Sequence, residues 1–320
     1  MQIVAVIIVF VLCILAVGNV ALARWVERRN PPVGRFIDVD GVRLHYLESG
    51  PPDAPPVVLF HGNGAMIQDL AGAGLIPLLA QRYRVIAFDR PGFGHSTRPR
   101  FRLMTPDAQA ALFQAALDRL GVRNNPIVFG HSWGTLVALA LAYRLRRAGQ
   151  PARGLVLAAG YYFPTWRLDV WLMAVPAIPL FGDILRYTIL PVLGWMLAGK
   201  TIAQLFAPAA VPTAFKTMFP MGMALRPSAL RATAEESLLM VPGAARLQKR
   251  YHEVSCPIVI YNAALDSLIE AEQAPRLNQV MTASVLHTVG GMGHMLHYAV
   301  PEKIVEAVDA VSARQPSASS

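Results

Sequence analysis

The segment that decides the fold is Ile127-Val128-Phe129-Gly130-His131-Ser132-Trp133-Gly134. Its first three residues form a short apolar run typical of a buried strand, and a helix is predicted over 133–147. Between them stands G-x-S-x-G, a pattern in which a sharp strand-to-helix turn lifts the serine hydroxyl to the top of a sheet. Because glycine has no Cβ, neighbouring backbone can approach this turn closely. The segment therefore predicts that Ser132 is a nucleophile.

Two residues that could activate such a serine follow later strand-like runs. Asp266 comes after residues 258–261, and His294 comes after residues 285–289. A serine hydroxyl needs a base to accept its proton, and the imidazole needs an acid to fix its tautomer. The chain order serine, aspartate, histidine, each just past a strand end, predicts a catalytic triad of Ser132, Asp266 and His294.

Each triad residue also has a plainer interpretation. Ser132 would fit an ordinary turn, Asp266 the N-cap of a helix, and His294 a loop. Glu270 lies one helical turn from Asp266, and His297 lies one turn from His294, so both are alternative candidates. Three coincidences in the order that the chemistry requires are harder to explain than one, and the triad is the preferred prediction.

A glycine-rich turn, His61-Gly62-Asn63-Gly64, follows the apolar run 57–60. The tetrahedral intermediate of acyl transfer needs preorganised N–H donors for its oxyanion. The backbone N–H groups of Asn63 and of Trp133, the residue after the serine, are the predicted donors of this oxyanion hole. The alternative is a glycine turn without a catalytic role.

A second glycine-rich turn spans 89–96 and reads D-R-P-G-F-G-H-S. It lacks the G-x-x-x-x-G-K-[ST] pattern of a phosphate-binding loop, so Asp89 and His95 are expected to be structural. The two cysteines, Cys13 and Cys256, have the spacing of neither a zinc site nor a disulfide framework. No metal and no cofactor is predicted.

Strand-like runs alternate with helical patterns from residue 34 onward. This alternation predicts an α/β fold with a mostly parallel, doubly wound sheet flanked by helices. An antiparallel hairpin turning at Asp40-Gly41 opens the sheet. The predicted strands are 35–40, 42–48, 57–60, 84–88, 127–129, 155–158, 258–261 and 285–289, and the predicted helices are 66–80, 106–120, 133–147, 271–279 and 301–311.

Residues 164–250 do not fit the alternation. They contain no clear strand, many prolines, three of the five tryptophans and six of the twelve methionines. Between Val170 and Gly199 the only charged residues are Asp183 and Arg186. A second transmembrane hairpin is conceivable, but the prolines and the charge pair interrupt it. We predict a helical lid packed over the sheet top around Ser132, its apolar residues forming lid core or lining a hydrophobic substrate cavity.

Residues 3–23 form an uncharged apolar run long enough to cross a membrane as a helix. Ala21-Leu22-Ala23 has the form of a signal cleavage site, but a positive n-region is lacking, so an uncleaved anchor is preferred. Arg24, Arg28 and Arg29 follow the run and predict that the downstream domain lies on the cytoplasmic side. A secreted or periplasmic protein is the alternative.

The composition limits the classes of partner. Hydrophobic residues make up 54% of the 320 residues and charged residues 15%, which excludes a mostly disordered chain. The net charge is +9, and 25 of the 29 basic residues are arginines. They are scattered, without a zinc-finger or RNA-binding signature, so no nucleic-acid partner is predicted. Attraction to anionic lipid headgroups remains open.

The motifs H-G-N-G, D-R-P-G-F-G-H-S, G-H-S-W-G, L-D-S and G-M-G-H together resemble the α/β-hydrolase fold superfamily over residues 34–311. They are most similar to its lidded branch, which includes esterases, lipases, epoxide hydrolases and haloperoxidase-like perhydrolases. That family usually has a glycine three residues before the acid, where this chain has Ala263. Epoxide hydrolases and haloalkane dehalogenases carry an aspartate at the position of Ser132, so the resemblance disfavours their chemistry.

The expected organisation has five parts: an anchor or signal segment (1–24), a first core part (34–163), a helical lid (164–250), a second core part (251–313) and a flexible tail (314–320). The expected function is that of a membrane-anchored serine hydrolase, which cleaves small lipophilic carboxylic esters through an acyl-enzyme and contacts membrane lipid. A perhydrolase or carbon–carbon bond hydrolase on the same triad, or a non-catalytic binder of hydrophobic ligands, are the alternatives. The oligomeric state stays open.

Overall fold

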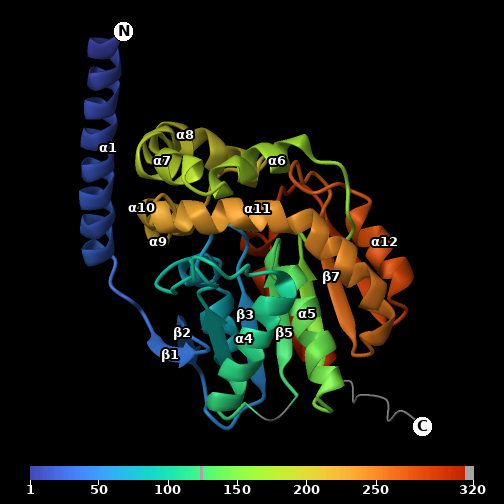
Figure 1. The fold of residues 1–320 in the computed structure, drawn as a ribbon. Helices are drawn as coiled ribbons and strands as arrows, with labels where there is room; N and C mark the ends of the chain where they lie inside the picture. Colours follow the sequence, from blue (N-terminus) through green and yellow to red (C-terminus); the bar gives the residue numbers. More distant parts are fainter. Residues whose placement is uncertain (123–124, 314–320) are drawn as a thin grey trace.

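The computed structural model describes residues 1–122 and 125–313, so the predicted flexible tail 314–320 lies outside the described residues. Its centre is an eight-stranded sheet with the order β1-β2-β4-β3-β5-β6-β7-β8 (Figure 1). Strand β2 is antiparallel to both of its neighbours, and all other pairs are parallel. The predicted hairpin and mostly parallel sheet are confirmed. The strands are β1 (Arg35–Val39), β2 (Val42–Ser49), β3 (Pro56–Phe60), β4 (Arg84–Phe88), β5 (Ile127–His131), β6 (Gly154–Ala158), β7 (Ile258–Ala263) and β8 (Ser284–Val289).

Helices cover both faces of the sheet, so the central strands are buried on both sides. In β3, Val58 and Phe60 pack into one apolar cluster, while Val57 and Leu59 pack into the other. The first cluster is covered by α4 (Pro106–Arg119), α5 (Gly134–Arg147) and α12 (Gln273–Val280), and the second by α2 (Ile67–Gly72), α3 (Leu75–Leu79) and α13 (Pro301–Ala313).

The single helix predicted over 66–80 is wrong, because the structure has two short helices there, α2 and α3. They are separated at Ala73-Gly74, where Gly74 has a φ of +80°. Residues other than glycine rarely adopt this left-handed backbone conformation, so Gly74 allows the chain to turn between the helices.

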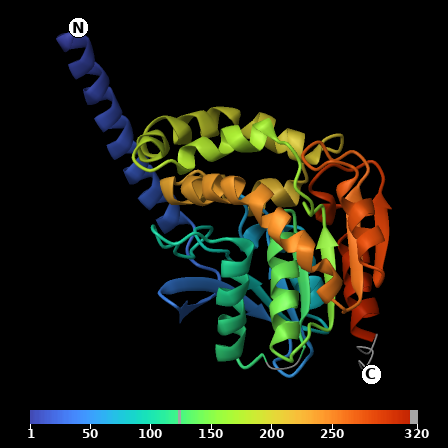
Figure 2. The ribbon, with the colours of Figure 1, turned by 45° about the vertical axis from the view of Figure 1, so that its right-hand side comes forward.

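The helices between β6 and β7 form an insertion in two layers (Figures 1 and 2). Helix α11 lies across the top of the sheet, and α6, α7 and α8 lie above it. The helical elements are α6 (Leu168–Ala174), η1 (Val175–Ala177), α7 (Phe181–Tyr187), α8 (Ile189–Phe206), α9 (Thr213–Met218), α10 (Met221–Ala224) and α11 (Pro227–Leu247), followed by η2 (Gln248–Glu253); a further short helix, η3 (Leu296–Tyr298), follows β8.

The outer layer of the insertion, α6–α8, differs from the expectation that its bulky side chains face the sheet. Many face outward, including Leu172, which is 63% exposed, and Met196, which is 74% exposed. The end of α8 reaches the loop before His294, where a Cβ on Gly293 would lie 2.2 Å from the Ala207 oxygen. Because α11 stands between this layer and most of the sheet top, the layer has only one side on which to bury side chains.

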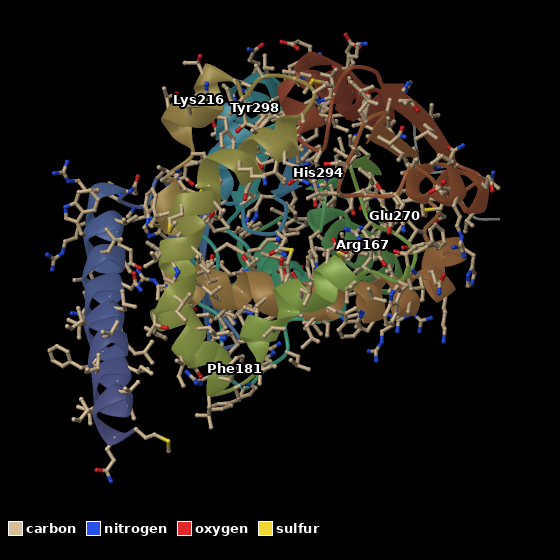
Figure 3. All side chains as sticks on the ribbon, turned by 90° about the horizontal axis from the view of Figure 1, so that it is seen from above. Arg167, Phe181, Lys216, Glu270, His294 and Tyr298 are labelled. Atoms are coloured by element: carbon tan, nitrogen blue, oxygen red, sulfur yellow. The ribbon has the colours of Figure 1, made fainter. Side chains whose placement is uncertain are left out.

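Helix α1 (Gln2–Arg29) stands beside the insertion and extends beyond it (Figures 1 and 3). Its C-terminal part is attached: Val26 packs with Met66 and Met223, and the Asn19 amide donates to the carbonyls of Tyr187 and Thr188. In the described part of the chain, α1 and α8 are long and apolar enough to cross a membrane. The bent pair formed by residues 168–177 and α7 would make a third span if counted as one.

Candidate active site

The turn around Ser132 is held by backbone contacts. Ser132 has a φ of +53°, in the left-handed region, and its N–H donates to the Ala158 carbonyl over 2.8 Å. A Cβ on Gly130 would lie 2.6 Å from the Gly134 oxygen, and one on Gly134 would lie 2.6 Å from the Phe60 oxygen. Both glycines are therefore required by close approach, and together they hold the strained serine with its side chain half-buried.

The structure brings the three predicted triad side chains into one hydrogen-bonded chain. His294 Nε2 lies 2.9 Å from Ser132 Oγ, and His294 Nδ1 lies 2.8 Å from Asp266 Oδ2. The side chains of His294 and Asp266 are each 6% exposed, so water competes little for these contacts. This arrangement can carry a proton from the serine hydroxyl to the imidazole.

Asp266 is prepared to remain an anion at neutral pH. Burial by itself would raise the pKa of this carboxyl, but the neighbouring His294 and two backbone N–H donors together lower it. The donors are Leu268 and Ile269, at 2.8 and 3.1 Å from Oδ1. The same carboxylate thus holds its own turn through one oxygen and His294 through the other.

The two alternative candidates lie elsewhere. Glu270 accepts from the Thr165 hydroxyl at 2.8 Å and lies 3.4 Å from Arg167, at the start of the insertion (Figure 3). His297 Nε2 lies 3.3 Å from Asp69 Oδ1. Neither makes the contact to His294 or Ser132 that its alternative role requires.

The two predicted oxyanion donors flank the serine. A Cβ on Gly62 would lie 3.1 Å from Ser132 Cβ, which places the turn containing Asn63 directly against the serine. Among the described residues, no backbone carbonyl in a turn or loop accepts a hydrogen bond from the N–H of Asn63 or Trp133. These two groups are therefore available to a ligand beside Ser132.

Comparison with known proteins identifies the family of this chain. The family model described as alpha/beta hydrolase fold matches residues 55–299, most of the chain. The chain belongs to the alpha/beta hydrolase fold family. The 2-hydroxymuconate semialdehyde hydrolase of Pseudomonas sp. is 32% identical over 229 residues, covering 67% of this chain and 77% of that protein.

Two further similarities have a narrower meaning. A haloalkane dehalogenase of Psychrobacter cryohalolentis is 40% identical to this chain over 121 residues. The chain spans only 37% of the length of that relative. The crystal structure of an alpha/beta hydrolase fold protein from Burkholderia ambifaria has a TM-score of 0.68 at 23% identity, covering 86% of this chain and 96% of that one. The second shows the fold alone.

The turn before Asn63 is fixed by a buried histidine. His61 Nδ1 lies 2.8 Å from the Gly62 oxygen, and His61 Nε2 accepts from the Arg90 N–H at 2.9 Å. Burial, with a smaller contribution from Arg90, lowers the pKa of His61 to about 3. A neutral imidazole that donates through Nδ1 and accepts through Nε2 satisfies both contacts.

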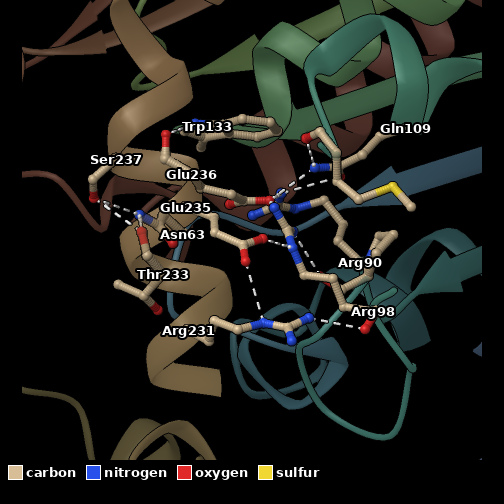
Figure 4. A network of polar contacts seen from close by, with 12 residues as sticks. Asn63, Arg90, Arg98, Gln109, Trp133, Arg231, Thr233, Glu235, Glu236 and Ser237 are labelled. Carbon is tan, nitrogen blue, oxygen red and sulfur yellow. Dashed lines mark hydrogen bonds and ion pairs between the residues drawn. The ribbon is translucent and has the colours of Figure 1, made fainter. Parts of the chain in front are cut away.

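Arg90 is the residue that sequence analysis missed (Figure 4). Its buried guanidinium donates to the carbonyls of His61 and Gly62 and pairs with the buried carboxylate of Glu236 on α11. The Trp133 indole donates to the Glu236 carbonyl at 3.0 Å. The Arg90–Glu236 ion pair and the hydrogen bond from Trp133 thus tie the insertion to the two sides of the predicted oxyanion hole. A D-R-P-G turn indicates an arginine near the site, but its acidic partner lies 146 residues away.

The turn 89–96 has the structural role that was expected. Asp89 accepts from the backbone N–H groups of Ile67 and His95, both at 2.9 Å, and contacts His45 Nδ1 at 2.7 Å. A Cβ on Gly94 would lie 1.9 Å from the Asp89 carboxylate, so only glycine fits there. The turn connects β2, β4 and α2 below the site.

Behind His294 lies a buried cluster of Asp69, His131 and His297. Each of the three residues offers one possible metal-ligand atom, and these atoms lie within 4.8 Å of one another, close enough to hold a metal ion. The ring centroids of His131 and His297 lie 4.1 Å apart. His131 Nε2 lies 3.1 Å from the His294 carbonyl oxygen. Burial lowers the pKa of His131 well below its usual value, so this ring packs neutral behind His294.

Proposed function

We propose that this hydrolase is a membrane-anchored serine hydrolase that cleaves lipophilic carboxylic esters. The single observation that carries the proposal is the chain Ser132–His294–Asp266, with contacts of 2.9 and 2.8 Å ending at a half-buried hydroxyl. The free N–H groups of Asn63 and Trp133 beside that hydroxyl support acyl transfer, which develops negative charge at this position.

In the proposed reaction, Ser132 Oγ attacks the ester carbonyl while His294 Nε2 accepts its proton. The N–H groups of Asn63 and Trp133 bind the resulting oxyanion, and Asp266 stabilises the imidazolium. Collapse of the intermediate breaks the bond to the alcohol, which leaves with the proton from His294. Water then attacks the acyl-enzyme by the same steps, releasing the acid and the free serine.

Anchoring by α1 supports a lipophilic substrate. The apolar run 3–23 lies within α1, and Ile3 and Val17 are 76% and 71% exposed. Apolar side chains on α7, which α1 contacts through Asn19, continue this exposed surface onto the insertion, among them Phe181 and Ile184, each 52% exposed. Large exposed apolar patches mark contacts with protein or membrane, and a spanning α1 places the bilayer beside this one. Arg24, Arg28 and Arg29 favour a cytoplasmic catalytic domain.

The catalytic part of the proposal is tested with purified full-length protein. A fluorophosphonate should label Ser132, and Ser132→Ala should abolish labelling. Specificity constants for C2 to C12 p-nitrophenyl esters should rise from acetate to medium chains, because each fully buried methylene contributes about 0.8 kcal/mol. A steady fall from C2 would contradict the lipophilic substrate, and labelling of Ser132→Ala would contradict the nucleophile.

The membrane part is tested by fractionation. The protein should stay with membranes after a high-salt wash, since salt screens surface charge but leaves apolar burial intact. A reporter at the C-terminus should indicate the cytoplasm. Release of a mature form beginning near Arg24 would support the secreted alternative instead.

Carbon–carbon bond hydrolysis is the second candidate, and one similarity favours it. The relative covering 67% of this chain is a 2-hydroxymuconate semialdehyde hydrolase. Assaying 2-hydroxymuconate semialdehyde beside the ester panel separates the two candidates: a higher kcat/KM for that compound than for any ester would favour the second.

A further inference from the structure

A cavity lies away from Ser132, at the C-terminal end of α1. Its volume is about 470 Å³, within the usual range for small-ligand sites. It opens between the last turns of α1, the turn 89–96, α7 and the start of α11. Six arginines line it: Arg43, Arg98, Arg100, Arg186, Arg226 and Arg231; the acidic residues of the lining are Glu27 and Asp183.

The acidic partners of this cavity are too few for its arginines. Glu27 pairs with Arg226, Asp183 is shared by Arg100 and Arg186, and Glu235 on α11 is shared by Arg98 and Arg231. Arg43 lies over the ring of Phe36, 3.9 Å from its centroid. Glu236, 3.7 Å from Arg98, already pairs with Arg90. Six arginines against Glu27, Asp183 and Glu235 leave an excess of three positive charges.

One of these arginines has an unused donor. The Arg98 side chain is 2% exposed, and its Nη2 has no hydrogen-bond partner among the described residues. Its Nε lies 2.5 Å from Glu235, and its Nη1 donates to the Pro91 carbonyl at 3.0 Å. A buried donor without an acceptor is costly, so an anion beside Arg98 would stabilise the site.

The position of the cavity relates it to α1. Tyr187 lines the cavity, and its carbonyl accepts from Asn19 at 2.9 Å. Glu27 also lines it. If the span ends at Ala23, Asn19 lies about 6 Å inside that end and Glu27 about 6 Å outside it, at 1.5 Å per residue. The cavity then lies at the depth of the lipid headgroups, which extend about 5–7 Å from the hydrocarbon core.

Helix α7 presents two kinds of surface at this depth. Asp183, Arg186 and Tyr187 line the cavity, while Phe181 and Ile184 are each 52% exposed. A ligand with an anionic group and an apolar tail would satisfy both surfaces. A soluble anion would satisfy only the first.

We propose that this cavity binds the phosphate of an anionic phospholipid, whose acyl chains lie along α1 and α7. The planar, two-pronged guanidinium matches phosphate oxygens, and the excess of positive charge favours an anionic over a zwitterionic lipid. This site rests on the anchoring by α1 proposed above, and it is independent of the chemistry at Ser132.

The test uses full-length protein in dodecyl maltoside micelles. Dissociation constants are measured for dihexanoyl phosphatidylglycerol, dihexanoyl phosphatidylcholine and inorganic phosphate. The variant is Arg43→Gln combined with Arg100→Gln, because both side chains are exposed and neither contacts the triad. The matched control is Arg82→Gln, an exposed arginine that pairs with Asp309 away from the cavity. The thermal unfolding midpoint checks that each variant is folded, so this control does not depend on the chemistry at Ser132.

Phosphatidylglycerol should bind more tightly than the other two probes. The double variant should weaken this binding about tenfold to a hundredfold, as expected for charge-assisted hydrogen bonds, and Arg82→Gln should leave it unchanged. Equal binding of phosphatidylcholine, or wild-type affinity in the double variant, would overturn the proposal. Equal binding of inorganic phosphate would make free phosphate the ligand and overturn the lipid assignment.

One further arm separates this site from the proposed function. Ser132→Ala should bind phosphatidylglycerol as the wild type does. A wild-type protein that binds the lipid but resists fluorophosphonate would refute the serine chemistry alone. A protein washed from membranes by salt would remove the anchoring on which the lipid site depends.

Discussion

The turn around Ser132 and the outer layer of the insertion, α6–α8, are held in place by different means. At the turn, backbone packs on backbone so closely that Gly130 and Gly134 accept no Cβ. In the outer layer, bulky side chains such as Leu172 and Met196 face away from the protein. The turn is determined by the chain's own sterics, whereas the outer layer depends on the medium that it meets.

This contrast indicates where substitutions act. Changes at the turn and its partners should alter rate constants, because these residues set the position of reacting atoms. Changes in the outer layer and α1 should alter stability and membrane association instead.

Ser132→Ala removes the proposed nucleophile and should lower ester kcat by several powers of ten, because members of a triad act as a unit. The fold should persist, since the Ser132 N–H still donates to Ala158. Turnover of a p-nitrophenyl ester is the measurement, with the thermal unfolding midpoint as the control. Wild-type turnover in the variant would show that Ser132 is not the nucleophile.

Asp266→Asn should lower kcat by about three to four powers of ten, because an amide cannot stabilise the imidazolium or hold the required tautomer of His294. The matched control is Glu270→Gln, which removes a nearby carboxylate that contacts Thr165 instead of His294. It should change kcat little. The reverse ranking would assign the acid role to Glu270.

Glu236→Ala tests the connection between the two regions. It leaves the buried Arg90 charge without its carboxylate, so the free energy of unfolding should fall by about 3–5 kcal/mol. Glu253→Ala is the control, because its partner Arg147 is 69% exposed and a surface ion pair contributes little. Chemical denaturation measures both. Equal losses would mean that Arg90 is not held mainly through Glu236.

The sequence predicts the turn around Ser132 and its partners better than it predicts the outer layer. Ser132, Asp266 and His294 could be placed because each follows a strand end in a fixed order, and short-range backbone rules apply there. The pairing of Arg90 with Glu236 could not, since no local pattern connects residues so far apart. The outward side chains of the outer layer were missed for a different reason: hydrophobicity predicts burial but does not say whether protein or lipid provides it.

Asn19→Leu should have the smallest effect. The Asn19 side-chain amide, on a residue that is 8% exposed, donates to the carbonyls of Tyr187 and Thr188 at 2.9 and 2.8 Å, between α7 and α8. Interhelical hydrogen bonds in membranes contribute only about 0.6 kcal/mol on average and about 1.7 kcal/mol at most, so the free energy of unfolding should fall by about 1 kcal/mol. Leucine keeps α1 apolar, so membrane association should not change.

Cys13→Leu is the matched control for this substitution, because Cys13 is exposed on the same helix and should leave stability unchanged. Both variants are compared by thermal unfolding in micelles and by fluorophosphonate labelling, which should be equal in both. If Asn19→Leu is as stable as Cys13→Leu, apolar packing alone attaches α1 to the insertion. A loss larger than that of Glu236→Ala would overturn the ranking, because the contact of α1 with the outer layer would then contribute more to stability than the Arg90–Glu236 ion pair.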